Sequence, residues 1–533
     1  ADLDEYDPHD LVGALISHWR LMQDRRRDEA KIKVYNPSQE EHGWYSKDTI
    51  VEVVAQDMPF LVDSISALLN RRGLTIRLTF HPVFAVNRDG SGRLTAIHEA
   101  ISGVDGVTTE AVIQLHVDRQ PDDSLAEIQN RVARVINDVT LATSDWLRMR
   151  SLAEKVHAEL GADPQRTSSE AVQEAQAFVN WMIHDHFLFI AACCFDLDDS
   201  NTGDGLRFVN GSGLGILRDG DEARSRAARW ISGLGRGLSN GSGDLIVTKA
   251  NARSSVHRPA YMDCITVNRR DEDGHVVGFY CFLGLFSSAA YSMPPHQIPL
   301  LRRKVEAVFA GAQTSPRSHS GRVVVNILDN FPRDALFQIS SEDLLATTLG
   351  VLSLQERQRT RLFIIPEPFR RFFSCLVYLP REQYSREVRL AVQKILVDAL
   401  GGTDVEFETQ FSESILARIH FVVRIPVDSK PAYDTEALEA HIVDVATTWQ
   451  DGLREALADQ VDERLAAQFF ETYAQAFPSG YREDCHPRIA VHDIQRIEAL
   501  RTTGRLGVHL YHPMAEKADQ MHVRLYSPGH AIS

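Results

Sequence analysis

The sequence predicts an α+β protein made of several domains, each an antiparallel sheet with helices packed on it. Two patterns predict this class. Residues 49–87 read as a strand, a helix and a second strand, and residues 170–312 hold many short strands separated by Gly, Asp, Asn and Ser. A length of 533 residues with 44% hydrophobic content is enough for about three or four such domains.

The first module is expected to span residues 1–165. Val51 and Val53 flank Glu52, an alternation typical of a half-buried strand. A helix should follow, because Pro59 suits its first position and the apolar residues after it recur at helical spacing (Leu61, Ile65, Leu68 and Leu69). With further strands near 76–80 and 112–117 and a helix over 125–139, this approximates a split βαββαβ unit, flanked by helices over 11–22 and 146–160.

Polar linkers that contain glycine and serine divide the rest of the chain into further modules. Residues 170–312 predict a curved antiparallel sheet, PAS-like by analogy of fold alone. Residues 322–432 predict helices followed by a second sheet-and-helix unit in altered order, and residues 433–502 a helical segment. Residues 503–533 close on a strand with no helix or partner strand after it, so we expect a chain cut inside a further unit of the same kind.

Composition excludes several classes of protein. A net charge of −16 argues against a nucleic-acid partner, which requires a basic face. No apolar run approaches the roughly 20 residues that a membrane span needs. The six cysteines are scattered without the spacing of a zinc site or a disulfide framework, which favours a reduced, cytoplasmic protein.

Three short motifs are better explained by structure than by chemistry. Gly211, Gly213 and Gly215 lack the spacing and the following helix of a dinucleotide fingerprint. The His184–His186 triplet has no third cluster of metal ligands, and Ser239 lies in a Gly/Ser-rich loop instead of a nucleophile elbow. We therefore expect no catalytic residue, no cofactor-binding residue and no metal site in this chain.

Six blocks of sequence carry a resemblance to a known family: QDMPFLVDSISALLNRRGL (56–74), TKANARSSVHRPAYMD (248–263), FLGLFSSAAY (282–291), IPLLRRKVEAVFAGA (298–312), PRDALFQIS (332–340) and AFPSGYRED (476–484). They resemble, in order, the N-terminal region of the large bacterial NAD-specific glutamate dehydrogenases. The resemblance implies ACT-like (ferredoxin-like) domains at 1–165 and 322–432, with a third begun at 503–533. It also implies a regulatory, homo-oligomer-forming region, sometimes controlled by an amino acid, while NAD and the catalytic domain belong to the missing C-terminal part of the intact enzyme.

The strand-to-helix turn of the first module is one candidate effector site: Asp57, Met58, Pro59, Phe60 and Ser64. Free backbone N–H groups at a helix start attract a carboxylate, and ACT domains commonly bind an amino acid there. The sequence departs from the usual ACT pattern, because Phe60 replaces the glycine that follows the proline. Its side chain would block close approach of a ligand or fill the pocket, and Asp57 would then only cap the helix.

A second candidate is the loop that carries Lys249, Arg253, His257 and Arg258. Its cations, hydroxyl groups and Tyr261 are typical of an anion pocket, of a contact with another domain, or of a loop held by its own hydrogen bonds.

These observations favour a non-catalytic regulatory and oligomerisation region of a glutamate dehydrogenase that turns L-glutamate into 2-oxoglutarate and ammonia. The rival hypothesis is a purely structural scaffold whose ACT-like units bind no ligand.

Overall fold

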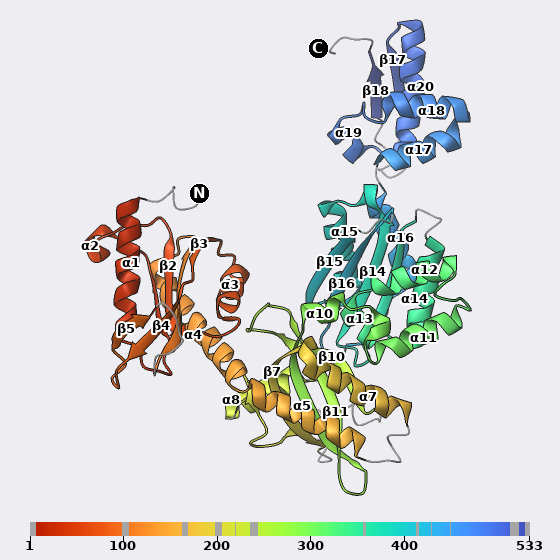
Figure 1. Ribbon diagram of the computed structural model, residues 1–533. Helices are drawn as coiled ribbons and strands as arrows, with labels where there is room; N and C mark the ends of the chain where they lie inside the picture. The colour runs from red at the N-terminus through yellow and green to blue at the C-terminus, as the bar shows by residue number, and fades with distance from the viewer. Residues whose placement is uncertain are drawn as a thin grey trace. The chain divides into compact units, whose positions relative to one another are not determined.

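The computed structural model describes residues 7–98, 106–162, 169–197, 205–218, 220–234, 243–354, 359–411, 415–427, 429–447, 449–511 and 522–527. The chain divides into two compact units. Figure 1 labels the helices and strands along the chain. The first comprises Ala1–Leu352 with Glu367–Arg371, and the second comprises Ser353–Pro366 with Phe372–Ser533. Several antiparallel sheets with helices confirm the α+β class.

The first sheet has the order β1-β2-β6-β4-β5, with β3 also paired to β6, and every pairing is antiparallel. Its strands are β1 (Lys31–Tyr35), β2 (Thr49–Gln56), β3 (Ile76–Phe80), β4 (Val83–Arg88), β5 (Leu94–His98) and β6 (Thr108–Val117). Its helices are α1 (Pro8–Met22), α2 (Gln39–His42), α3 (Leu61–Arg71) and α4 (Asp122–Ser144).

Both faces of this sheet are covered. Val51 and Val53 share a core with α3 and α4, whereas Ile50 packs with Ala14 of α1 on the opposite face. Glu52 is therefore fully buried, and the prediction of a half-buried strand is wrong because α1 covers the second face. The Glu52 carboxylate accepts hydrogen bonds from the Tyr35 hydroxyl (3.0 Å) and other polar groups beneath α1.

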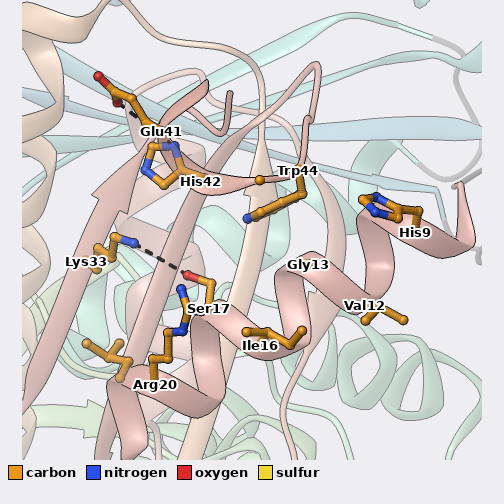
Figure 2. Close-up of a pocket in the computed structure, with 12 residues that line it drawn as sticks. His9, Val12, Gly13, Ile16, Ser17, Arg20, Lys33, Glu41, His42 and Trp44 are labelled. Atoms are coloured by element: carbon orange, nitrogen blue, oxygen red, sulfur yellow. Dashed lines mark hydrogen bonds and ion pairs between the residues drawn. The ribbon is translucent and has the colours of Figure 1, made fainter. Parts of the chain in front are cut away.

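A groove runs along the side of α1, between it, β1 and α2 (Figure 2). Its volume is about 490 Å³. Val12, Ile16 and Trp44 give it apolar walls, while Arg20 and Lys33 bring two cations.

The middle module of the first unit is a sheet of order β10-β11-β12-β7-β8, with β9 paired to β7. Its strands are β7 (Phe187–Leu197), β8 (Leu206–Phe208), β9 (Leu214–Gly215), β10 (Leu245–Arg253), β11 (Tyr261–Arg270) and β12 (Val276–Phe286). Helices α5 (Trp146–Gly161), α7 (Glu170–Trp181), the π-helical turn η2 (Met182–His186) and α8 (Asp221–Trp230) accompany it. One continuous core joins this sheet to the first, since α4 residues such as Val139 cluster with Ile216 and Leu217.

Short helices complete the first unit: α10 (Ser288–Ser292), η3 (Pro295–Gln297), α11 (Leu301–Gly311), α12 (His319–Asp329), α13 (Arg333–Gln338) and α14 (Ser341–Leu354), whose last two residues belong to the second unit. Among the residues that the structure describes, no helix has the length and apolar character to cross a membrane.

The second unit holds a sheet of order β13-β14-β16-β15, covered by α15 and α16. Its elements are β13 (Arg361–Pro366), β14 (Phe372–Pro380), η4 (Arg381–Gln383), α15 (Arg386–Leu400), β15 (Asp404–Phe411), β16 (Leu416–Arg424) and α16 (Thr435–Ala446). Helices α17 (Trp449–Gln460), α18 (Glu463–Tyr473), α19 (Ser479–Asp484) and α20 (Pro487–Thr503) follow, and then the hairpin of β17 (Gly507–Tyr511) and β18 (His522–Tyr526).

The first sheet and the sheet of the second unit share one departure from the split βαββαβ order. The fourth strand of that order should follow the second helix and pair beside the first strand. In both units this place is taken by a strand that precedes the others in the chain, β1 beside β2 and β13 beside β14. The altered order predicted for the second unit is confirmed, and the first unit has the same order because β1, a strand the sequence did not predict, takes this place.

We expect the first unit to lose stability as the pH falls from 6.5 to about 4. Burial of His18 between α1 and the sheet lowers its pKa to about 4, although the contact with Val53 O opposes this. Burial also lowers the pKa of His116 to about 4. In this window the unfolded chain binds protons that the folded chain does not, which removes up to roughly 3 kcal/mol per histidine.

Urea denaturation at stepped pH measures this loss. His18→Gln keeps an amide that can donate to Val53 O but does not titrate, so the variant should lose less stability over the window. His275→Gln, which changes an exposed histidine in the β11–β12 turn, is the control and should follow the wild type. A His18→Gln profile parallel to the wild type would contradict the assignment.

Candidate functional site

The loop between β10 and β11 docks on the start of α3. The backbone N–H of His257 donates to Ser64 Oγ (2.8 Å), and that hydroxyl donates to Phe60 O (2.5 Å). The rings of Phe60 and His257 lie 5.0 Å apart, and Ser255 Oγ donates to Asp138 Oδ2 on α4 (2.7 Å). The loop thus contacts α3 and α4 of the first module, as one of the alternatives from the sequence predicted.

Three residues that line one pocket beside this contact have a left-handed backbone. In the described part of the chain, six residues other than glycine have a positive φ, and Phe60 (70°), Asp185 (63°) and His257 (65°) are among them. Each such conformation costs about 1–3 kcal/mol and persists only where the surrounding structure imposes it. All three line the same pocket.

This junction pocket has a volume of about 350 Å³. It is lined by Phe60, Trp146, Asp185, Phe187, Leu188, His257, Arg258, Leu285, Phe286, Ser287, Ser288 and Tyr291. Most of the wall is aromatic or aliphatic, and a few polar groups converge in it, which is the usual constitution of a small-molecule site.

The polar groups of the junction pocket keep bonding capacity for a ligand. Among the residues that the structure describes, Arg258 bonds only through Nη2, to Phe286 O (3.0 Å) and the Tyr291 hydroxyl (3.3 Å). Across the described residues, the Asp185 carboxylate meets no hydrogen-bond donor or cation, and the buried Ser287 hydroxyl has no hydrogen-bond partner. A guanidinium and a carboxylate in one apolar pocket suit a small ligand that carries both charges.

A chain of bonds leads from the pocket to α13. The Tyr291 hydroxyl, which accepts from Arg258, donates to Asp334 Oδ1 (3.0 Å). Lys249 Nζ lies 2.8 Å from Asp334 Oδ2 and 2.7 Å from Asp263 Oδ1. Two cations and two carboxylates therefore balance one another behind the pocket.

Burial sets the titration of this network. It raises the pKa of Asp263 to about 6, although the Lys249 ammonium opposes the rise. Burial also disfavours the charge of Asp334, but Lys249 and Tyr291 hold the pKa of Asp334 below its usual value. Asp334 is thus the carboxylate that stays charged beside Tyr291.

The predicted effector residues divide into two groups. Phe60, His257 and Arg258 line the junction pocket. Ser64 does not line it, but its hydroxyl accepts a hydrogen bond from the backbone N–H of His257. The others lie outside its lining, and whether any of them binds an effector stays a prediction. Met58 packs against α4 with Sδ 3.7 Å from Thr140 Oγ1.

Lys249 and Arg253 have other partners. Lys249 is held by two carboxylates, and the Arg253 guanidinium lies over the Tyr261 ring at 4.4 Å. The backbone N–H of Asp57 donates to Thr109 O (3.0 Å) and so ties the turn to β6.

The start of α3 differs from the prediction. Helix α3 begins at Leu61 with Phe60 as its N-cap and without a side-chain cap, so Pro59 is not the first helical residue and Asp57 is not the cap. The left-handed turn at Phe60 is the reason, because it redirects the chain one residue after the proline.

Sequence reasoning predicted three of the twelve lining residues and missed the other nine, among them the polar residues Asp185, Ser287 and Tyr291. Asp185 was noticed only as part of the His184–His186 triplet, and Ser287 and Tyr291 lie in the block 282–291 that carries the resemblance.

The remaining motifs have structural roles where the structure describes them. At Gly215 (φ 63°) an added Cβ would lie 2.1 Å from Ile190 O, which explains a glycine there, whereas Ser239 lies outside the described residues. His184 and His186 contact backbone oxygens through Nδ1, those of Asn180 (2.7 Å) and Trp181 (2.9 Å).

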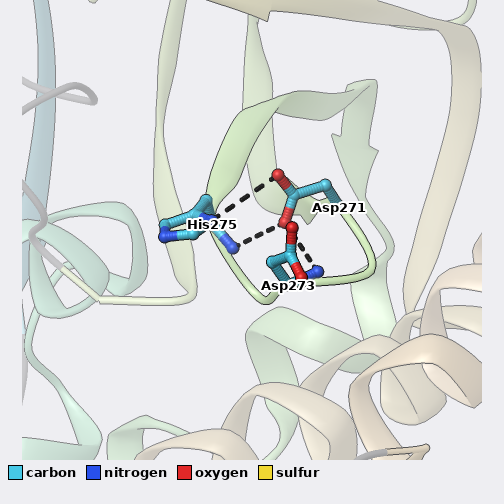
Figure 3. Close-up of side chains that lie close together, drawn as sticks. All are labelled: Asp271, Asp273 and His275. Atoms are coloured by element: carbon cyan, nitrogen blue, oxygen red, sulfur yellow. Dashed lines mark hydrogen bonds and ion pairs between the residues drawn. The ribbon is translucent and has the colours of Figure 1, made fainter.

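One group of potential metal ligands comes together in the described residues: Asp271, Asp273 and His275 (Figure 3). All three are exposed in the β11–β12 turn, and Asp271 Oδ1 accepts from the backbone N–H groups of Asp273 (3.1 Å) and His275 (2.8 Å). These bonds explain why an aspartate occupies position 271, because its side chain stabilises the turn by accepting from the backbone.

Comparison with known proteins follows the order of these units. Four segments match domain families of glutamate dehydrogenase: the ACT1 domain (1–132), helical motif 1 (298–357), the ACT2 domain (361–450) and helical motif 2 (456–500).

Three curated relatives bear the name NAD-specific glutamate dehydrogenase. The protein of Halomonas elongata is 36% identical over 534 residues, which cover 100% of this chain and 33% of the relative. The protein of Pseudomonas aeruginosa is 33% identical, and the match covers 97% of this chain and 32% of the relative. The protein of Mycobacterium tuberculosis is 30% identical, and the match covers 92% of this chain and 29% of the relative. The chain spans about a third of the length of these relatives.

Removal of the Ser64 hydroxyl should loosen the docked loop. Ser64→Ala leaves the backbone N–H of His257 without its acceptor in a poorly hydrated contact, which costs about 1–3 kcal/mol. Urea denaturation measures the loss, and hydrogen exchange should show faster exchange at residues 254–260. Ser151→Ala, which changes an exposed serine on α5, is the control. Equal stability of the two variants would show that the hydrogen bond does not hold the loop.

Proposed function

Because this chain is homologous to the N-terminal third of the large NAD-specific glutamate dehydrogenases and carries their ACT and helical-motif domains, we propose that it is the regulatory region of such an enzyme. The intact cytoplasmic enzyme oxidises L-glutamate to 2-oxoglutarate and ammonia with NAD as hydride acceptor. The remaining two-thirds of the polypeptide supply that chemistry, and this region is non-catalytic and contributes to a homo-oligomer.

The regulatory role is the binding of a small amino-acid effector in the junction pocket. The observation that carries it is that one pocket wall holds both the Arg258 guanidinium and the Asp185 carboxylate, together with three left-handed residues. The guanidinium binds the effector carboxylate through its unused nitrogens, and Asp185 binds the ammonium group. The aromatic wall takes the side chain.

The hydrogen bonds from Arg258 through Tyr291 to Asp334 couple effector binding to α13. An effector carboxylate on the other nitrogens of Arg258 draws the guanidinium away from Tyr291, and Tyr291 in turn contacts Asp334 on α13. Helix α13 lies in the segment matched as helical motif 1. The effector thus favours one arrangement of this helix over another by differential contacts, as allosteric coupling requires.

Two finer features of the fold belong to the same proposal. The curved sheet of the middle module, with β7 and β12 at its centre, supports a PAS-like shape. The β17–β18 hairpin supports the start of a third ACT-like unit, because one of its faces exposes paired aliphatic residues that need a cover (Val508 with Leu525, Leu510 with Val523).

The rival function is a scaffold that binds nothing. Phe60 favours it, since this side chain occupies the turn where an ACT domain commonly admits its ligand and packs against the tilted ring of His257.

Thermal shift with a panel of L-amino acids distinguishes the two. At about 100 times the dissociation constant a true effector should stabilise the chain by roughly 2.7 kcal/mol. Arg258→Gln should abolish the shift, while Arg134→Gln, on the exposed side of α4, should retain it. Asp185→Asn keeps a residue that tolerates the left-handed backbone, and it should weaken binding of the amino acid but not of its 2-oxo analogue. A flat screen would favour the scaffold.

The chain alone should not reduce NAD in the presence of L-glutamate. A spectrophotometric assay at high protein concentration tests this, and the full-length enzyme from the same source is its positive control. Turnover that follows the purified chain through a second column would overturn the assignment of catalysis to the rest of the polypeptide.

A further inference from the structure

Helix α1 presents an apolar stripe on the side away from its sheet. Val12, Leu15, Ile16 and Trp19 recur at the spacing of one helix face and are each 45–66% exposed. The opposite side is occupied, since Ala14, His18 and Met22 are buried. A contiguous stripe of large apolar side chains on the surface is typical of an interaction site.

Charges of opposite sign flank the two ends of the stripe. Asp7 and Asp10 lie at the N-terminal end, and Asp2, Asp4 and Glu5 precede them in the sequence. Arg20 lies in the last turn, and Lys33 of β1 reaches the same end, 3.5 Å from Ser17 Oγ. Within the described part of the chain, neither cation forms an ion pair with a carboxylate.

Figure 2 shows Val12, Ile16 and Arg20 along one side of α1, with Lys33 facing the helix across the groove. Apolar and cationic groups are therefore continuous on this surface.

We propose that this surface binds α1 of a second copy of the chain, with the two helices antiparallel about a twofold axis between residues 15 and 16. In this register Val12 meets Trp19 of the second copy, and Leu15 meets its Ile16. The acidic end of each helix then lies beside Arg20 and Lys33 of the other. The same patch serves both copies, as a twofold interface requires.

Charge complementarity selects the second copy over an unrelated partner. Antiparallel pairing brings each acidic end to a cationic end and opposes the two helix dipoles, whereas parallel pairing would place like charges together. Fifteen residues give a helix about 22 Å long. A pair of such helices buries less than the roughly 1,200 Å² of a standard interface, so the association is weak in isolation and gains from other contacts in an oligomer.

This inference rests on the proposed function, because the surface supplies one contact of the homo-oligomer proposed there. It can be measured without effector, NAD or glutamate, so its failure is separate from a failure of the junction pocket to bind a ligand.

Sedimentation velocity of the 533-residue chain from about 1 to 100 μM tests the proposal. The wild type should show a concentration-dependent dimer. Leu15→Glu places a charge at the centre of the stripe and should weaken dimerisation by at least about tenfold. Leu147→Glu is the matched control, since Leu147 on α5 is 68% exposed, and it should dimerise as the wild type does.

A charge exchange tests the register. Arg20→Glu alone and Asp10→Lys alone each place like charges at both ends of the interface and should be monomeric. An equimolar mixture of the two restores opposite charges at both ends and should dimerise. Circular dichroism confirms folding, because Asp10 also accepts from Tyr45 N (3.0 Å).

Three results would overturn the proposal: a monomeric wild type over the whole range, equal effects of Leu15→Glu and Leu147→Glu, or a mixture that associates no better than its components.

Discussion

The first unit depends on the burial of α4 between two sheets. Val132 and Val139 of this helix belong to one core that continues through Ile216 and Leu217 into the middle sheet. Neither sheet can shift against α4 without opening this core, and close-packed interiors resist such gaps. The loop after β10 is therefore held against α3, and the junction pocket is the space that remains where these elements meet.

The strain at the pocket follows from this packing. Phe60 and His257 keep unfavourable backbone conformations because the Ser64 hydroxyl bonds both of them. A site that stores strain beside a partly engaged guanidinium can respond to a ligand by a small rearrangement. The bonds from Arg258 through Tyr291 to Asp334 give that rearrangement a defined path.

Periodicity in the sequence predicted most helices and strands, because they alternate or repeat over several residues. It did not predict that β1 pairs with β2, since five residues such as Lys31–Tyr35 carry no signal of their long-range partner. Phenylalanine does not favour a left-handed backbone, so the sequence gives no sign of the turn at Phe60. The hydrogen bond between Ser64 and His257 joins residues 193 positions apart, which a local pattern cannot predict. The pocket thus arises from tertiary contacts, although three of its lining residues were predicted as effector residues.

Hydrogen exchange with and without the amino acid that stabilises the chain best tests the central claim most directly. Bound effector should slow exchange at residues 182–188, 254–260 and 284–291, which surround the junction pocket, and should alter exchange in α13. Protection confined to other parts of the chain, or no amino acid that changes exchange at all, would contradict the account and leave a scaffold without a sensor.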